Sequence, residues 1–296
     1  MPLRLIVAAL AISLPSLLQS ANAAPAAVAP QSSARAGWNA PQTPFRIYGN
    51  TWYVGVRGLT AILVTSPAGD VLIDGDLPES APLIEDHIRA LGFRLADVKL
   101  ILNTHAHYDH AGGIAQLQRD TGAEVVASVA GAALMARGGR GDPQYGDAYP
   151  YTPPGRIRTV ADGEIVKLGP LAIATHLTPG HTPGSTTWTW RSCEADRCLD
   201  IVYADSLSTP DYKLVNNPEY PGIVGDYRHS FATIAALPCD IVLSPHPGMV
   251  DFWERVDKLQ AGDANALIDR NGCRKYAQDA STAFEAKLAE QEAAAR

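Results

Sequence analysis

Three histidines and one aspartate lie within six residues of one another, as His105, His107, Asp109 and His110. His105 and His107 are two residues apart, so on an extended chain both imidazoles can face one side and bind one metal ion. Asp109 and His110 follow a short turn later and can face a second ion, because one tetrahedral ion cannot use all four ligands and keep a position open for water. Imidazole nitrogen and carboxylate oxygen favour zinc over iron or manganese. The alternative is a histidine-rich surface loop, and it requires the whole pattern to arise by chance.

These candidate ligands are predicted to follow strands. Val98–Leu102 is a short apolar run typical of a buried strand, and the histidine cluster comes directly after it. Open α/β sheets bind ligands at the carboxyl ends of their strands. Five of the eight histidines fall in loops after predicted strands, and this recurrence indicates a dinuclear site. The expected ligand sets are His105, His107 and His181 for one ion, and Asp109, His110 and His246 for the other.

Four segments resemble the metallo-β-lactamase superfamily, and downstream residues resemble its β-lactamases of subclass B3. The segments are His105-Ala106-His107-Tyr108-Asp109-His110, Gly180-His181-Thr182-Pro183-Gly184-Ser185-Thr186, Tyr203-Ala204-Asp205-Ser206-Leu207-Ser208 and Pro245-His246-Pro247-Gly248. The resemblance extends from about Trp38 to the C-terminal helix. It implies an α/β fold, an αββα sandwich of two mixed β-sheets flanked by helices.

The resemblance also implies an activity and a cofactor. The expected reaction is hydrolysis of the β-lactam amide bond by a metal-bound hydroxide, with two Zn²⁺ per chain. Asp109 would bind the second ion and orient the nucleophile, and so is the expected catalytic residue. Penicillins, cephalosporins and carbapenems are the expected substrates, so the protein would confer resistance to β-lactam antibiotics.

Two serines are candidate substrate contacts. Another subclass has a metal-binding cysteine where this chain has Ser206, and a serine hydroxyl is a poor zinc ligand. The second ion would therefore use His110. Ser206 and Ser208 are then expected to donate hydrogen bonds to a substrate carboxylate. The alternative is that both serines cap local backbone.

Asp74 and Tyr145 are the remaining candidate site residues. Asp74 follows the predicted strand Val71–Ile73, and its carboxylate could accept hydrogen bonds from the metal-binding loop and hold it in place. A turn aspartate that bonds its own backbone is an equal alternative. Tyr145 lies in Gly138–Gly155, a long segment without periodicity that we predict to be a flap beside the site. An ordinary packed tyrosine is the competing interpretation.

Two rival functions remain open. Thioester hydrolases of the glyoxalase II type and lactonases belong to the same superfamily, and they usually carry a bridging aspartate near the position of Asp205. A zinc protein without enzymatic activity would close each site with a fourth protein ligand. Three ligands per ion argue against that second rival.

The rest of the chain predicts the elements that position these residues. Phe45 to Ile73 alternates as a β-meander, and Ser80 to Leu91 is an amphipathic helix. A helix over Gly112–Thr121, a strand over Glu124–Ser128 and a further short helix give the chain its α/β character. With 46% hydrophobic residues, residues 37–296 can form one domain with a large core. We expect a monomer.

The start of the chain resembles an export signal. Residues 1–23 combine a basic start, the apolar run Leu5–Leu18 and an Ala-x-Ala cleavage site, which is typical of a signal peptide cleaved after Ala23. Residues 24–36 are rich in Ala, Pro, Ser and Gln and predict a flexible arm. We expect export to a bacterial periplasm and no membrane span in the mature chain. The net charge of −7 and the lack of a basic stripe argue against nucleic acid as a partner.

Four cysteines in an exported protein predict two disulfides. Three pairings of Cys193, Cys198, Cys239 and Cys273 are open. We favour Cys193–Cys198, which would link the two strands of a hairpin. Cys239–Cys273 then remains, and it matches a bridge common in subclass B3.

Overall fold

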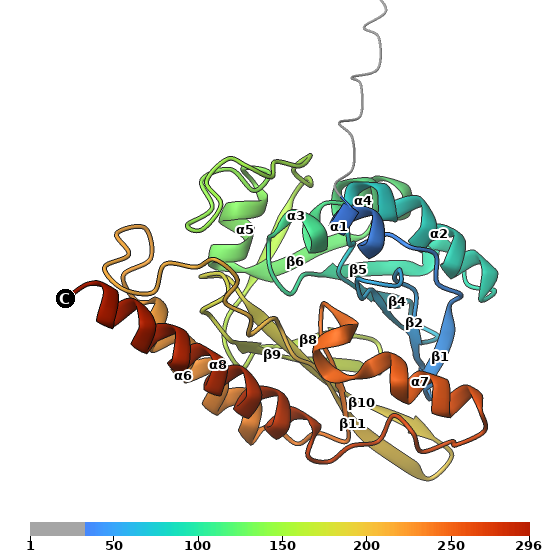
Figure 1. Ribbon diagram of the computed structural model, residues 1–296. Helices are drawn as coiled ribbons and strands as arrows, with labels where there is room; N and C mark the ends of the chain where they lie inside the picture. Colours follow the sequence, from blue (N-terminus) through green and yellow to red (C-terminus); the bar gives the residue numbers. More distant parts are fainter. Residues whose placement is uncertain (1–32) are drawn as a thin grey trace, which may run out of the picture.

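The computed structural model describes residues 33–296, and in it two β-sheets pack face to face between two layers of helices (Figure 1). The first sheet has seven strands in chain order, namely β1 (Phe45–Tyr48), β2 (Thr51–Tyr53), β3 (Ile62–Val64), β4 (Asp70–Ile73), β5 (Val98–Leu102), β6 (Glu124–Ser128) and β7 (Ile157–Val160). The strands from β1 to β4 are antiparallel, and β4, β5, β6 and β7 are parallel. The predicted meander is therefore present, and the sheet is mixed.

The second sheet has five strands in the order β12-β11-β10-β9-β8. They are β8 (Ile165–Leu168), β9 (Leu171–Leu177), β10 (Thr186–Glu194), β11 (Arg197–Tyr203) and β12 (Ile241–Leu243). The pairs from β8 to β11 are antiparallel, and β12 runs parallel to β11. Side chains such as Ile73, Leu102 and Trp188 from the two sheets form one continuous core between them.

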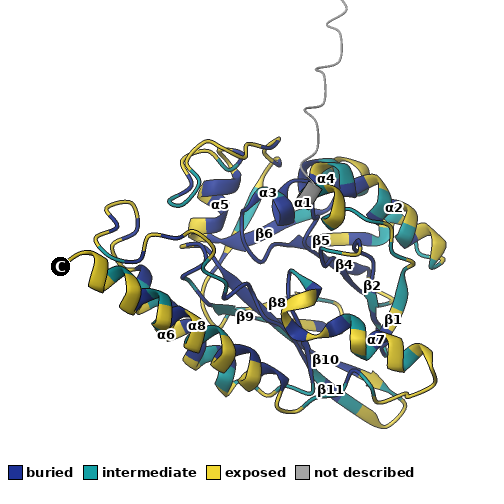
Figure 2. Ribbon diagram, viewed as in Figure 1, coloured by how far each residue is buried: buried dark blue, intermediate teal, exposed yellow. Residues whose placement is uncertain are grey.

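The helices cover the outer faces of both sheets, as the yellow outer and dark blue inner surfaces in Figure 2 show. Those on the first half are α1 (Ser33–Trp38), α2 (Ala81–Ala90), α3 (Tyr108–Ala111), α4 (Ile114–Thr121) and α5 (Val129–Met135). Those on the second half are α6 (Ile223–Ala236), α7 (Phe252–Gln260) and α8 (Gly272–Ala294), while η1 (Pro78–Ser80), η2 (Leu95–Asp97) and η3 (Pro247–Val250) are short 3₁₀ turns. On α2 the buried Ile84 and Ile88 join Leu72 of the sheet in a second core. The αββα sandwich expected from the sequence is confirmed.

Two predicted boundaries differ from the structure. Helix α1 begins inside the segment expected to be a flexible arm, and Arg35 of this helix forms an ion pair with Glu79 at 2.7 Å. The helix expected over Gly112–Thr121 begins two residues later, as α4 (Ile114–Thr121), and the separate short helix α3 ends just before Gly112. Gly112 and Gly113 lie between the two helices, close against Pro78 and Gly75. The predicted signal peptide, residues 1–23, lies outside the described residues.

Both predicted disulfides are present. Cys193 and Cys198 face each other across the β10–β11 hairpin, and Cys239 before β12 is bonded to Cys273 in the first turn of α8. The second bridge therefore fixes the start of the longest helix beside the edge strand of the second sheet. Within residues 33–296, no helix is long and apolar enough to cross a membrane.

Several candidate site residues lie in loops that follow the carboxyl ends of strands. Asp74 follows β4, His105 follows β5, Asp205 follows β11 and His246 follows β12. Asp74 has a left-handed backbone with φ 64°, an uncommon conformation for a residue other than glycine. The two sheets thus bring residues from distant parts of the sequence to one edge of the sandwich.

Candidate active site

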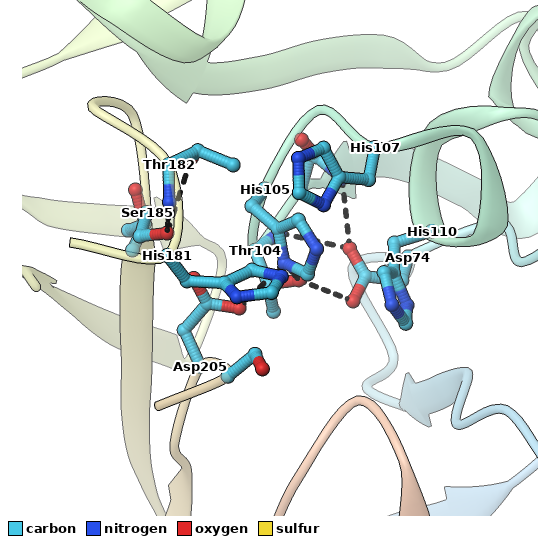
Figure 3. A network of polar contacts seen from close by, with 12 residues as sticks. Asp74, Thr104, His105, His107, His110, His181, Thr182, Ser185 and Asp205 are labelled. Atoms are coloured by element: carbon cyan, nitrogen blue, oxygen red, sulfur yellow. Dashed lines mark hydrogen bonds and ion pairs between the residues drawn. The ribbon is translucent and has the colours of Figure 1, made fainter. Parts of the chain in front are cut away.

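The imidazoles of His105, His107 and His181 converge at this edge (Figure 3). Each offers one ligand atom, and these atoms lie within 4.8 Å of one another, with all three residues buried. We call this trio the three-histidine group. The ring centroids of His105 and His181 are 4.7 Å apart although 76 residues separate them in the chain, given by 181 − 105.

Asp109 and His110 lie beside this trio on the short helix α3. Their ligand atoms and one of His105 again lie within 4.8 Å of one another. His246 approaches from the end of β12, and its Nε2 is 3.4 Å from Asp109 Oδ2. His110 Nε2 is also 3.4 Å from that oxygen. We call Asp109, His110 and His246 the Asp109 group, and the structure brings together all six residues predicted to be ligands.

Asp74 connects the end of β4 to the loop that carries His105. Its Oδ1 accepts hydrogen bonds from the backbone amide of Thr104 at 2.8 Å and from Asn103 Nδ2 at 3.0 Å. Its Oδ2 accepts from the Thr104 hydroxyl at 2.7 Å and from Tyr203 at 3.0 Å. These partners are distant in sequence, so Asp74 is not a turn aspartate that bonds its own backbone. Asp74 holds the loop against both sheets.

Two of the histidine rings are oriented by hydrogen bonds from behind. His105 Nδ1 donates to Asp205 Oδ1 at 2.7 Å, and His181 Nδ1 donates to the carbonyl of Ser208 at 2.8 Å. In each ring Nε2 is therefore the nitrogen left with a free lone pair. Asp205 is fully buried and lies behind His105, outside both candidate ligand groups. This placement disfavours a bridging role for Asp205.

The protonation states suit metal binding. Burial lowers the pKa of His105 well below its usual range, and the neighbouring His110 and His107 lower it further. Burial and His105 likewise hold the pKa of His181 low. Burial alone would raise the pKa of Asp109, but His110 and His246 together bring it well below its ordinary value. Neutral imidazoles and an ionised carboxylate are the forms that bind metal.

Several buried nitrogens in the site have no hydrogen-bond partner among the described residues. They are Nε2 of His105, Nε2 of His107 and both ring nitrogens of His110. A buried polar atom without a partner carries a free-energy cost of about 1–3 kcal/mol, so such atoms are rare without a functional reason. These nitrogens lie beside the ionised carboxylate of Asp109, so the donor atoms together fit a divalent metal ion.

An open cavity of about 820 Å³ lies over these groups. Its wall includes His107, Asp109, His181 and His246 together with Tyr145 and Ser208. The Tyr145 ring centroid is 5.0 Å from that of His107, so this predicted contact does face the site. Ser206 does not line the cavity. Its side chain is buried and its hydroxyl lies 3.0 Å from that of Ser208. The Ser206 hydroxyl oxygen also accepts a bond from the Ser208 amide at 3.4 Å, which is the local backbone contact of the alternative.

Sequence reasoning missed several residues of the site. Trp38 from α1 packs on His246 with ring centroids 5.4 Å apart, although its segment was expected to lie at the edge of a flexible arm. Tyr276 of α8 accepts a hydrogen bond from the Leu207 amide at 2.9 Å and donates to the Asp205 carbonyl at 3.1 Å. Asp142 of the flap lies 3.2 Å from His107 Nε2. Of these three residues, only Tyr276 could have been suspected from the sequence, because it lies three residues after Cys273, which was expected to form a disulfide.

Comparisons with known proteins agree with this geometry. Residues 54–246 match the family described as "Metallo-beta-lactamase superfamily". The Rm3 metallo-β-lactamase structure is 48% identical, with a TM-score of 0.85 over 89% of this chain and 100% of that one. MEM-A1, a subclass B3 metallo-β-lactamase from a soil metagenome library, is 52% identical, with a TM-score of 0.83 over 88% of this chain and 100% of that one.

More distant curated relatives are hydroxyacylglutathione hydrolases. One from Rhodospirillum rubrum is 33% identical over 143 residues, which is 48% of this chain and 45% of that protein. The chain spans about half the length of the first curated relatives it matches. The two sheets, the converging ligand groups and the full-length structural matches lead to one conclusion: the chain belongs to the metallo-β-lactamase superfamily and, within it, to the metallo-β-lactamases of subclass B3.

Proposed function

We propose that this chain hydrolyses the amide bond of β-lactam antibiotics, with penicillins, cephalosporins and carbapenems as substrates. The observation that carries the proposal is the pair of ligand groups on the wall of one open cavity, in a chain that matches metallo-β-lactamases over their whole length. The cavity lies within the range of about 300–1,000 Å³ usual for small-molecule sites.

We propose two zinc ions as the cofactor. His105, His107 and His181 would hold one ion, and Asp109, His110 and His246 would hold the other. Nitrogen and carboxylate donors suit zinc, and three protein ligands per ion leave a position for water or substrate. When bound, zinc supplies a Lewis acid and lowers the pKa of a water to near neutrality, so that this water can act as a nucleophile.

The side chains of the chain then have distinct tasks. The ionised Asp109 has a second carboxylate oxygen that can accept a hydrogen bond from the attacking water and orient it. Water adds to the carbonyl carbon, the C–N bond breaks, and the amide nitrogen takes up a proton. The Ser208 hydroxyl would donate a hydrogen bond to the substrate carboxylate, with Ser206 orienting Ser208 from behind. Tyr145 would contact the substrate from the flap side of the cavity.

We also propose that the chain is exported to the periplasm as a monomer after cleavage following Ala23. The apolar start of the sequence supports export, and the two disulfides suit an oxidising compartment. Residues 37–296 would then form the enzyme domain.

Thioester hydrolysis is the alternative, since the curated relatives are hydroxyacylglutathione hydrolases. The position of Asp205 behind His105 argues against the bridging aspartate that such an enzyme would use. The test is a substrate panel for the purified, zinc-loaded protein, with a penicillin, a cephalosporin, a carbapenem and a hydroxyacylglutathione thioester. We expect cleavage of the β-lactams and little cleavage of the thioester. Thioester cleavage alone would overturn the proposal.

A further inference from the structure

The flap residues 138–155 meet the three-histidine group at one carboxylate. The backbone of the flap has left-handed φ values of 61°, 76° and 69° at Gly138, Gly139 and Gly141, which glycine adopts without the steric cost of a side chain. The chain then turns back on itself, and the amide and carbonyl of Asp142 pair with those of Gly146 at 3.1 and 2.8 Å. This closed turn places Asp142 on the inner side of the flap, with 6% of its surface exposed.

The two carboxylate oxygens of Asp142 face different partners. Oδ1 accepts hydrogen bonds from the backbone amides of Gln144 and Tyr145 at 2.8 and 2.9 Å. Oδ2 is buried and lies at an ion-pair distance of 3.2 Å from Nε2 of His107, and neither atom has a hydrogen-bond partner among the described residues. One side chain therefore touches both a ring of the metal-binding group and the backbone that carries Tyr145.

From this geometry we infer that Asp142 is a positioning residue, which orients His107 for metal binding and ties the flap to that histidine. The inference rests on the proposed role of His107 as a zinc ligand. An Nε2–H that points at Asp142 leaves the lone pair of Nδ1 for the ion. The same carboxylate holds the amide of Tyr145, whose ring lies 5.0 Å from the ring of His107 on the cavity wall. Metal affinity and flap position are thereby coupled.

The competing role is purely local. An aspartate that accepts bonds from the amides two and three residues later is a common turn cap. Such a cap would need neither burial nor a second oxygen directed at a histidine. Asp147 of the same flap provides the comparison, because it is exposed and its Oδ1 accepts a bond from the Gly141 amide at 2.9 Å, within the flap.

Asp142→Asn separates the two roles. The amide oxygen of Asn can still accept the bonds from Gln144 and Tyr145, so the turn cap is preserved. Its NH₂ group then faces His107 Nε2 and favours the Nδ1–H tautomer, which has no Nδ1 lone pair for a metal. We expect zinc affinity to fall by about 10–100-fold, the usual effect of removing such an outer contact. Asp147→Asn is the matched control and should keep wild-type affinity.

The readouts are metal affinity and a spectrum, not turnover alone. Metal-free protein is titrated with zinc against a chromophoric chelator, and the cobalt-substituted protein is compared by visible absorption. The Asp142→Asn substitution should weaken zinc binding and change the cobalt spectrum. Thermal unfolding is measured to check that this variant is folded. Histidine-labelled zinc-loaded wild type should also show His107 as the Nε2–H tautomer by long-range ¹H–¹⁵N correlation.

The outcomes are distinguishable. Equal zinc affinity and equal cobalt spectra for Asp142→Asn, Asp147→Asn and wild type would overturn the inference and leave the proposed function intact. An Nδ1–H tautomer for His107 in the zinc-loaded wild type would overturn it as well, even if the variant failed to fold. Wild type that binds no zinc would overturn the proposed function and this inference together.

Discussion

The two ligand groups differ in the protein contacts that hold their ligand side chains in place. In the three-histidine group, Asp205 and the Ser208 carbonyl accept hydrogen bonds from two rings, and Asp142 lies 3.2 Å from the third. In the Asp109 group, His110 has no hydrogen-bond partner on either ring nitrogen among the described residues. His246 makes a longer contact of 3.3 Å, from Nδ1 to the Gly58 carbonyl, and its side chain is 20% exposed.

This difference indicates unequal preorganisation. Ligands fixed by outer contacts lose less freedom when they bind an ion, and such contacts typically change metal affinity about 10–100-fold. The three-histidine group should therefore bind its ion more tightly than the Asp109 group. Asp76 lies near Asp109 and is fully buried, and among the described residues neither of its carboxylate oxygens has a hydrogen-bond partner.

The largest expected effect comes from removing a ligand of the better-held group. We expect His181→Ala to lower zinc affinity at the tighter site by more than about 100-fold, beyond the range of outer contacts, and to abolish measurable β-lactam hydrolysis. His246→Ala should leave the tighter ion in place and weaken only the second. Isothermal titration of metal-free variants with zinc measures both. Equal losses at the tighter site for the two variants would contradict the comparison.

The next effect concerns the contact behind His105. Asp205→Ala removes the acceptor for His105 Nδ1, so the ring loses its fixed tautomer and orientation. We expect zinc affinity at the tighter site to fall about 10–100-fold, and the chelator competition assay measures it. Asp196→Ala, at an exposed position of the β10–β11 hairpin turn, is the control and should change nothing.

A third effect is the order of filling. Cobalt added to the metal-free wild type should enter the three-histidine group first, so the visible spectrum should change character after the first equivalent. In His246→Ala the first-equivalent spectrum should match that of wild type. A first-equivalent spectrum that changes in this variant would show that the Asp109 group fills at the same time or earlier.

The smallest effect is on stability near the Asp109 group. Burial, together with Asp74 and Asp109, raises the pKa of Asp76 well above its ordinary value, so keeping this carboxyl buried costs folding free energy at high pH. The cost grows as pH rises above the unfolded pKa and vanishes below it, where both states are protonated. Asp76→Asn should therefore raise the melting temperature at pH 8, by about 2–4 °C for each kcal/mol gained in the free energy of unfolding. Near pH 3 it should leave the melting temperature unchanged. A change in melting temperature that is equal at pH 3 and pH 8 would show that the effect does not come from titration of Asp76.

Much of this architecture follows from sequence pattern. The apolar run at Val98–Leu102 forms β5, which is buried except for Lys99, and the neighbouring strand β4 is buried along its whole length. The ligand cluster could be predicted because its residue types and spacing carry direct chemical meaning. The cysteine count predicted two disulfides but left three pairings open, and Cys239–Cys273 was expected as the pair left over, which matches a bridge common in subclass B3. The short α3 was less visible, since four residues give no periodicity.

The rest depends on contacts between distant segments. Asp142 is one of two acidic residues in a glycine-rich stretch, and only the folded chain shows that it faces His107. Asp205 appears in sequence as an aspartate near a motif, so its position behind His105, rather than between two ions, was not predictable. Trp38 reaches His246 across more than 200 residues of chain, given by 246 − 38 = 208, and no local pattern encodes that packing.

The most direct test combines metal content with turnover in one titration. Protein freed of metal by a chelator is given zinc stepwise, and bound zinc and carbapenem hydrolysis are measured at each step. The account predicts no hydrolysis without metal, recovery as zinc binds, and full binding at two ions per chain with one held more tightly. Hydrolysis by the metal-free protein at the loaded rate, or an inert protein with two bound zinc ions, would contradict it.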